Sequence, residues 1–146
     1  MNLSPHFCLA ELTRTGTGIA NDPAPSQVAA LTSLCLHVLE PIRALLGVPL
    51  RVTSGFRSAQ VNAAINGAAG SQHMRGEAVD FVPVGMDVET AMARIAAARI
   101  PVDQLIVYPR GGFIHVSYAA GKAQRRQLLR SDAAGGSGGP YHPWLA

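Results

Sequence analysis

The stretch Ser71-Gln-His-Met-Arg-Gly-Glu-Ala-Val-Asp80-Phe81 carries two side chains that can bind a metal ion, one before a turn and one after it. His73 offers an imidazole nitrogen and Asp80 a carboxylate oxygen, and both groups bind divalent metals. Gly76 lies between them and lets the backbone turn where a side chain would obstruct it. Residues 77–82 then alternate as a short strand does. The stretch therefore predicts a turn leading into a strand, with one potential ligand on each.

Asp80 needs a partner in this setting. It would share one strand face with small and apolar residues, while Val79 and Phe81 occupy the other face. An unpaired buried carboxylate is costly, and a cation is one partner that offsets this cost. Three protein ligands with a fourth position open for water make a catalytic zinc site. The best third ligand is His115, between apolar residues of the predicted strand 113–118. The predicted Zn²⁺ ligands are His73, Asp80 and His115.

This pattern resembles a known family. S-x-H-x-x-G-x-A-x-D followed by a strand carrying H-x-S is similar to the zinc D-alanyl-D-alanine carboxypeptidase and endopeptidase family. These peptidoglycan peptidases share their fold with the hedgehog signalling domain and the vancomycin-resistance dipeptidases. The resemblance extends from Leu3 to about Leu129. Three stretches within it resemble the phage-borne branch: Leu3–Thr13, Val38–Arg43 and Val52–Ser58.

The resemblance implies both a fold and an activity. The fold is α+β, with a small, mainly antiparallel sheet, packed helices and one zinc ion. The activity is hydrolysis of an amide bond in peptidoglycan stem peptides, by an endolysin-like endopeptidase or a D,D-carboxypeptidase. The alternative is a zinc-bearing module that binds cell wall or builds a virion, with weak or no catalysis.

Two polar residues are the predicted substrate contacts. Arg57 follows a strand through a Gly-containing turn, where a guanidinium can present a fork of donors to a carboxylate or an oxyanion. The matching arginine in the resembling enzymes binds substrate and stabilises the charge of the transition state; the alternative is a surface arginine. Ser71 is expected either to hydrogen-bond substrate or to fix the loop that presents His73. Asn62 and Gln104 are expected to be supporting residues.

The general base is left open. Many resembling enzymes carry an acid three residues before the last histidine or near the end of the preceding strand. Here position 112 is Gly and the predicted strand ends at Tyr108, a poor base because its reference pKa is about 10. Asp103 is the nearest acid, and it either serves as the base or caps a turn. Glu77 is expected to point away from the face that carries Asp80.

Composition limits the partners. The 146 residues carry a net charge of +3, which suits contact with an anionic polymer such as a cell wall. Nucleic-acid binding would normally require clustered basic residues, and only Arg125-Arg126 with their neighbours approach a cluster. We therefore expect a monomer that acts on peptidoglycan stem peptides and binds no nucleic acid. The two cysteines are too few for a disulfide framework, although a Cys8–Cys35 bridge stays open.

The ends of the chain carry further expectations. Residues 1–6 lack a basic segment followed by an apolar run, so we expect no signal peptide. We expect synthesis in the cytoplasm and action on the cell wall or periplasm, after phage-type release or as a virion component. No window of roughly 18 apolar residues is apparent, so no membrane span is expected. We divide the chain into a zinc peptidase domain, 1–130, and a Gly-rich tail, 131–146.

Periodicity and turn residues predict the remaining elements. We expect a long helix from an N-cap at Ser26 to Gly47, kinked or divided at Pro41. Shorter helices are expected after Ser58 and after Asp87. Strands 103–108 and 113–118 should form a hairpin. Residues 121–129 are expected to be helical, residues 131–139 to be mobile, and Trp144 either to dock on the domain or to stay in the tail.

Overall fold

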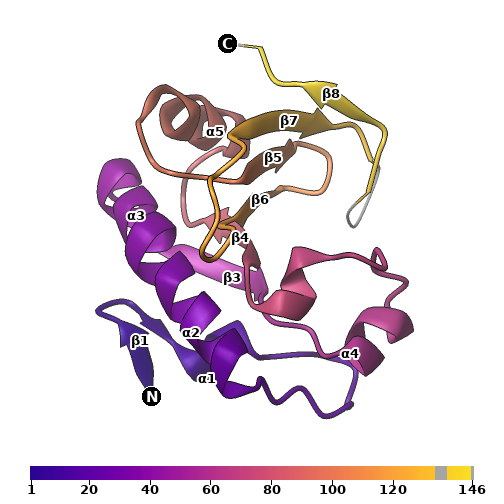
Figure 1. Ribbon diagram of the computed structural model, residues 1–146. Helices are drawn as coiled ribbons and strands as arrows, with labels where there is room; N and C mark the ends of the chain where they lie inside the picture. Colours follow the sequence, from indigo (N-terminus) through magenta and orange to yellow (C-terminus); the bar gives the residue numbers. More distant parts are fainter. Residues whose placement is uncertain (134–137, 146) are drawn as a thin grey trace.

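The computed structural model describes residues 1–133 and 138–145 (Figure 1). The helical elements are α1 (Leu9–Leu12), α2 (Pro25–Leu34), the π-helix η1 (Cys35–Leu39), α3 (Glu40–Leu46), α4 (Ala59–Ala64), the 3-10 helix η2 (Gln72–Arg75) and α5 (Val88–Ala97). The strands are β1 (Asn2–Ser4), β2 (Phe7–Cys8), β3 (Leu50–Ser54), β4 (Ala78–Pro83), β5 (Gln104–Tyr108), β6 (Phe113–Ser117), β7 (Gln127–Ser131) and β8 (Tyr141–Pro143).

The main sheet has the strand order β3-β4-β6-β5-β7-β8, and β1 pairs with β2 in a separate ribbon. Neighbouring strands of the main sheet are antiparallel except for β5 and β7, which are parallel. The predicted α+β fold with a mainly antiparallel sheet is therefore confirmed. The predicted hairpin is also confirmed, since β5 and β6 pair from Leu105–Val116 to Tyr108–Phe113.

The predicted long helix is one run of three segments, α2, η1 and α3 (Figure 1). Its predicted start at Ser26 is wrong: Ala24 is the N-cap and Pro25 occupies the first turn, where its missing N–H costs nothing. A π-helical turn just before Pro41 divides the run into segments, as expected of a proline there, but the helical run continues through it. A proline disturbs the preceding helical turn, and there the Glu40 N–H bonds to the Cys35 carbonyl, five residues back. The π-helical turn thus accommodates Pro41 without breaking the run.

The helical run supplies much of the core. Its predicted apolar stripe is buried against the sheet, at 0–5% exposure: Leu31, Cys35, Val38, Leu39, Ile42 and Leu46. By length and composition alone, Pro25–Leu46 would also be long and apolar enough to cross a membrane, contrary to the expectation that no window would qualify. Its buried stripe accounts for this apolarity as that of a core helix. Cys8 and Cys35 are both free thiols.

Two predicted helix caps are confirmed. The Ser58 hydroxyl accepts the Val61 N–H at the start of α4. An Asp87 carboxylate oxygen accepts the Thr90 N–H at the start of α5, at 3.0 Å. Both side chains satisfy N–H groups that the first helical turn leaves without intrahelical partners.

The chain after Gly121 departs from expectation. The predicted helix over 121–129 is wrong, because Gly121 and Arg126 have positive φ and the chain then forms β7 along β5. This pairing covers an edge of β5 that would otherwise expose unpaired backbone groups.

The predicted boundary at residue 130 falls inside β7, and the sheet continues into β8. The position of Trp144, which the sequence left undecided, is on the domain. Its backbone N–H donates to the Leu128 carbonyl at 3.0 Å. Its side chain packs against the core and lies beside Ala93, Ala96 and Ala97 of α5. Of the segment expected to be mobile, residues 134–137 lie outside the described residues.

Candidate metal centre and cleft

The three predicted ligands lie together. Asp80 on β4 and His115 on β6 are directly opposite each other in the sheet, which points their side chains to the same face. The Asp80 Oδ1 atom lies 2.8 Å from His115 Nδ1 and 3.4 Å from His73 Nε2. One ligand atom from each of the three residues lies within 4.8 Å of the others.

The turn before β4 holds His73 in place. Ser71 caps η2 by accepting the His73 N–H at 3.2 Å, a contact that corresponds to one of the two roles expected for this serine, fixing the loop. Gly76 ends η2 with a φ of +72°, and a Cβ there would lie 2.5 Å from the Gln27 carbonyl oxygen. His73 Nδ1 donates to the Gly55 carbonyl at 2.7 Å, which leaves Nε2 facing Asp80. A ring fixed through its other nitrogen is typical of metal-binding histidines.

Burial and charge act together on these groups. Burial alone would raise the pKa of Asp80, but its interactions with His73 and His115 outweigh burial and hold that pKa well below its usual range. Burial lowers the pKa of His73, which favours the neutral imidazole. An ionised carboxylate and a neutral imidazole are the protonation states that bind metals.

The donor set therefore fits a zinc ion. Two imidazole nitrogens and one carboxylate oxygen are ordinary zinc ligands, and three protein ligands leave a position open. His73 and Asp80 are buried at 3% and 6% exposure, so a compensating cation is favoured over hydration. The same residues line a cavity of about 840 Å³ that also contains Arg57, Ser71 and Tyr108.

Arg57 also faces this cavity, but not from an exposed turn. It is 7% exposed, which excludes the alternative of a surface arginine. Its Nε donates to Ser54 Oγ at 3.2 Å and its Nη1 to Asn62 Oδ1 at 3.0 Å, while Nη2 lies 3.9 Å from Asp80 Oδ2. Asn62 is thus a supporting residue, as foreseen. The guanidinium is held rigidly beside the ligand cluster.

Comparison with known families agrees with this geometry. A family profile described as Peptidase M15 matches residues 5–117. The chain belongs to the peptidase M15 family. Its members are zinc metallopeptidases, and the His73–Asp80–His115 cluster fits a metal site. A comparison with curated proteins found no matching relative.

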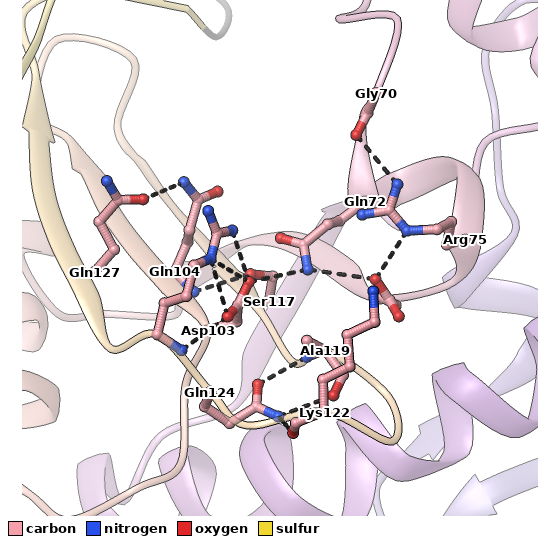
Figure 2. A network of polar contacts seen from close by, with 12 residues as sticks. Gly70, Gln72, Arg75, Asp103, Gln104, Ser117, Ala119, Lys122, Gln124 and Gln127 are labelled. Atoms are coloured by element: carbon pink, nitrogen blue, oxygen red, sulfur yellow. Dashed lines mark hydrogen bonds and ion pairs between the residues drawn. The ribbon is translucent and has the colours of Figure 1, made fainter.

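In this M15 domain, Asp103 is part of a polar network beside the cavity (Figure 2). It is 2% exposed, and its carboxylate accepts the Arg125 backbone N–H at 2.9 Å and the Arg125 Nη2 at 2.7 Å. Gln72 Nε2 donates to the same carboxylate at 3.2 Å. Hydrogen bonds from Arg125 lower the pKa of Asp103. These contacts resemble a structural anchor more than a free base, although they are not the turn cap that the sequence suggested.

Glu77 corrects another expectation. It was expected to point away from the Asp80 face, yet it lines the same cavity and is 9% exposed. Its carboxylate accepts Arg75 Nε at 3.0 Å and the Ala120 N–H at 3.1 Å. The strand begins only at Ala78, so strand alternation does not apply to residue 77. Pattern reasoning therefore missed it.

Gln104 and Tyr108 mark the two ends of β5. Gln104 donates through Nε2 to Gln127 Oε1 at 2.7 Å and so links β5 to β7, as a supporting residue would. Tyr108 is 2% exposed and lines the cavity at the strand end, where many resembling enzymes carry an acid. Gly112 supplies no acid in the turn that follows.

Asp103→Asn should weaken the fold and leave the rate nearly unchanged. The loss in unfolding free energy should be about 1–2 kcal/mol, at the low end for charged hydrogen bonds because the Arg125 side chain is 58% exposed. A lowered pKa in the folded state stabilises the protein above about pH 4, the unfolded value. This stabilisation is lost as the pH falls through the lowered pKa. Below about pH 4, the unfolding free energy of Asp103→Asn should therefore fall less steeply with pH than that of the unaltered protein. Circular dichroism at a series of acid pH values measures this dependence.

Asp22 is exposed, so Asp22→Asn serves as the matched control. Its stability and its rate of hydrolysis should both be unchanged. A hundredfold loss of rate in Asp103→Asn at full zinc occupancy would instead make Asp103 the general base, since base assistance contributes about 10²–10⁴-fold.

Proposed function

We propose that this M15 peptidase hydrolyses an amide bond in peptidoglycan stem peptides, as an endolysin-like endopeptidase or a D,D-carboxypeptidase. The observation that carries the proposal is the His73–Asp80–His115 cluster beside Arg57 in one cavity of about 840 Å³. Family membership supports peptidase chemistry. The net charge of +3 suits an anionic wall polymer.

His73, Asp80 and His115 would hold the zinc ion. When bound, zinc polarises a substrate carbonyl and makes water a better nucleophile near neutral pH. Hydrolysis adds water across the amide: the carbonyl carbon gains the hydroxyl, the C–N bond breaks and the leaving nitrogen takes the proton. Arg57 carries a rigid positive charge toward the cavity, where it binds a substrate carboxylate or the developing oxyanion. Ser71 lines the cavity as well and contributes a hydroxyl to substrate binding.

The biological setting is part of the proposal. Similarity of the motif stretches to the phage-borne branch suggests a lysis or virion-associated enzyme, made in the cytoplasm and acting on the wall or periplasm. We propose that it works as a monomer, without a nucleic-acid partner or a membrane span.

One observation favours a second candidate. Tyr108 and Gly112 stand where many resembling enzymes carry an acid. Besides Asp80, the carboxylates among the described residues that line the cavity are Glu77 and Asp103, and arginines engage both. A zinc-bearing module that binds cell wall or builds a virion, with little turnover, would need no base.

Purified cell wall separates the two candidates. The zinc-loaded protein should clear wall in a zymogram, a chelator should abolish clearing, and added zinc should restore it. Mass spectrometry of the released muropeptides then identifies the bond that is cut. Wall binding without any new muropeptide ends would support the non-catalytic module and contradict the peptidase.

A further inference from the structure

The last strand of the sheet places a second tyrosine over the cleft. Paired residues of neighbouring strands point to one face, so His115 shares its face with Ile106, and Ile106 shares it with Leu129 of β7. Tyr108 lies two residues after Ile106. On β8, Tyr141 pairs with Ser131, two residues after Leu129. The register therefore sets both tyrosines on the face that carries the metal ligands.

The two tyrosines contact each other across β7. Their hydroxyl oxygens are 3.2 Å apart, and their rings meet edge to face at 81°. The Tyr108 ring also stacks on Phe113 at a centroid distance of 4.4 Å. Tyr108 is 2% exposed, whereas Tyr141 is 47% exposed, and both line the cavity. Tyr108 is thus a fixed group, and Tyr141 covers it from the solvent side.

The hydrogen bonds leave one hydroxyl proton for a ligand. The Tyr108 and Tyr141 hydroxyls share one hydrogen bond, in which either oxygen can be the donor. A phenol has one proton and two acceptor lone pairs. One of the two hydroxyl protons is used between the rings, and when Tyr141 is the donor the Tyr108 proton stays free to donate to a ligand. Tyr108 lines the same cavity as Asp80 and Arg57.

We propose that Tyr108 is a catalytic residue that donates a hydrogen bond to the carbonyl oxygen of the scissile amide, and that Tyr141 is the positioning residue that orients it. The inference rests on the proposed peptidase function. Tyr108 keeps its proton throughout, so it stabilises the charge that develops on the oxygen and does not act as a base. Burial raises the pKa of Tyr108, which agrees with a permanent donor.

The positioning residue lies outside the region that the family profile covers. The Peptidase M15 match ends at residue 117, whereas Tyr141 belongs to β8. Two further contacts hold β8 in place: its pairing with β7 and the Ser131 hydroxyl bond to the Gly138 carbonyl. The C-terminal strand is thus a part of this chain's own cleft.

The test uses the full-length, zinc-loaded protein and four variants: Tyr108→Phe, Tyr141→Phe, the double variant and Tyr118→Phe. Tyr118 stacks on His37 and is the matched control for losing a tyrosine hydroxyl. Turnover is measured on a purified muropeptide, with zinc content and melting temperature alongside. A readout independent of turnover is the calorimetric affinity for a phosphinate analogue of the cleaved bond, which mimics the tetrahedral transition state.

Tyr108→Phe should lower kcat by about 100-fold with KM nearly unchanged, and should weaken phosphinate binding by a similar factor. Tyr141→Phe should lower kcat by about fivefold, as the loss of one positioning hydrogen bond would. The double variant should be no worse than Tyr108→Phe, because Tyr141 acts only through Tyr108. Tyr118→Phe should behave like the unaltered protein.

An unchanged kcat and phosphinate affinity in Tyr108→Phe would overturn the inference while leaving the peptidase function intact. So would additive losses in the double variant, or a change confined to the melting temperature. An unaltered protein that neither cleaves muropeptides nor binds the phosphinate would refute the proposed function first, and this inference with it.

Discussion

Asp80→Ala is expected to leave the protein without zinc and without measurable hydrolysis. Asp80 Oδ1 is the atom that both histidines approach, at 2.8 and 3.4 Å, so its loss removes the centre of the donor set. Loss of a supporting residue beyond the ligands already costs about 10–100-fold in metal affinity, and loss of a ligand should exceed about 100-fold. Elemental analysis after dialysis should give about one zinc per chain in the unaltered protein and almost none in Asp80→Ala.

The controls separate metal loss from unfolding. Removing one member of a buried charged cluster is itself destabilising, because Arg57 loses its neighbouring charge. Asp80→Asn keeps the shape of the side chain and should still lose zinc, with a folded circular dichroism spectrum. Asp22→Ala removes an exposed carboxylate elsewhere and should keep full zinc. His73→Ala and His115→Ala should also lose zinc, and full zinc in His115→Ala would contradict the assignment.

The metal cluster could be anticipated because its geometry is mostly local. His73 and Asp80 belong to one turn and strand, and the alternation of that strand fixes the face of Asp80. His115 needed only one long-range assumption, that two apolar strands pair, and the register Asp80–His115 satisfies it. Cap residues such as Ser58 and Asp87 were predictable for the same reason, since a cap acts within three residues.

The parts that were missed depend on contacts between distant segments. Arg57 is buried because Asn62 of α4 and Asp80 of β4 surround it, and no pattern near residue 57 contains that information. The segment after Gly121 has no strong period, so its conformation is decided by the open edge of β5. Pairing to an edge strand depends on tertiary context more than on propensity. Tyr141 enters the cleft only through that pairing.

Arg57→Ala is expected to lower kcat by about 10²–10³-fold, or about 2.7–4 kcal/mol of transition-state stabilisation, the usual cost of losing one donor to an oxyanion. The expectation rests on a guanidinium held by Ser54 and Asn62 and lying 3.9 Å from the Asp80 carboxylate. A buried arginine also supports the fold, so the variant should melt at a lower temperature. The rate must therefore be measured per folded, zinc-loaded molecule.

Two further variants separate the roles of Arg57. Arg57→Lys keeps the charge but loses the planar fork, so it should recover stability better than rate. Asn62→Ala removes the partner of Nη1 and leaves the guanidinium in place, so it should lower stability with a smaller loss of rate. For each of the three variants, we would measure the melting temperature by circular dichroism, the zinc content and kcat on a purified muropeptide. A folded, zinc-loaded Arg57→Ala with near-normal kcat would show that Arg57 serves the fold alone, since a donor to the transition state cannot be removed without slowing the reaction.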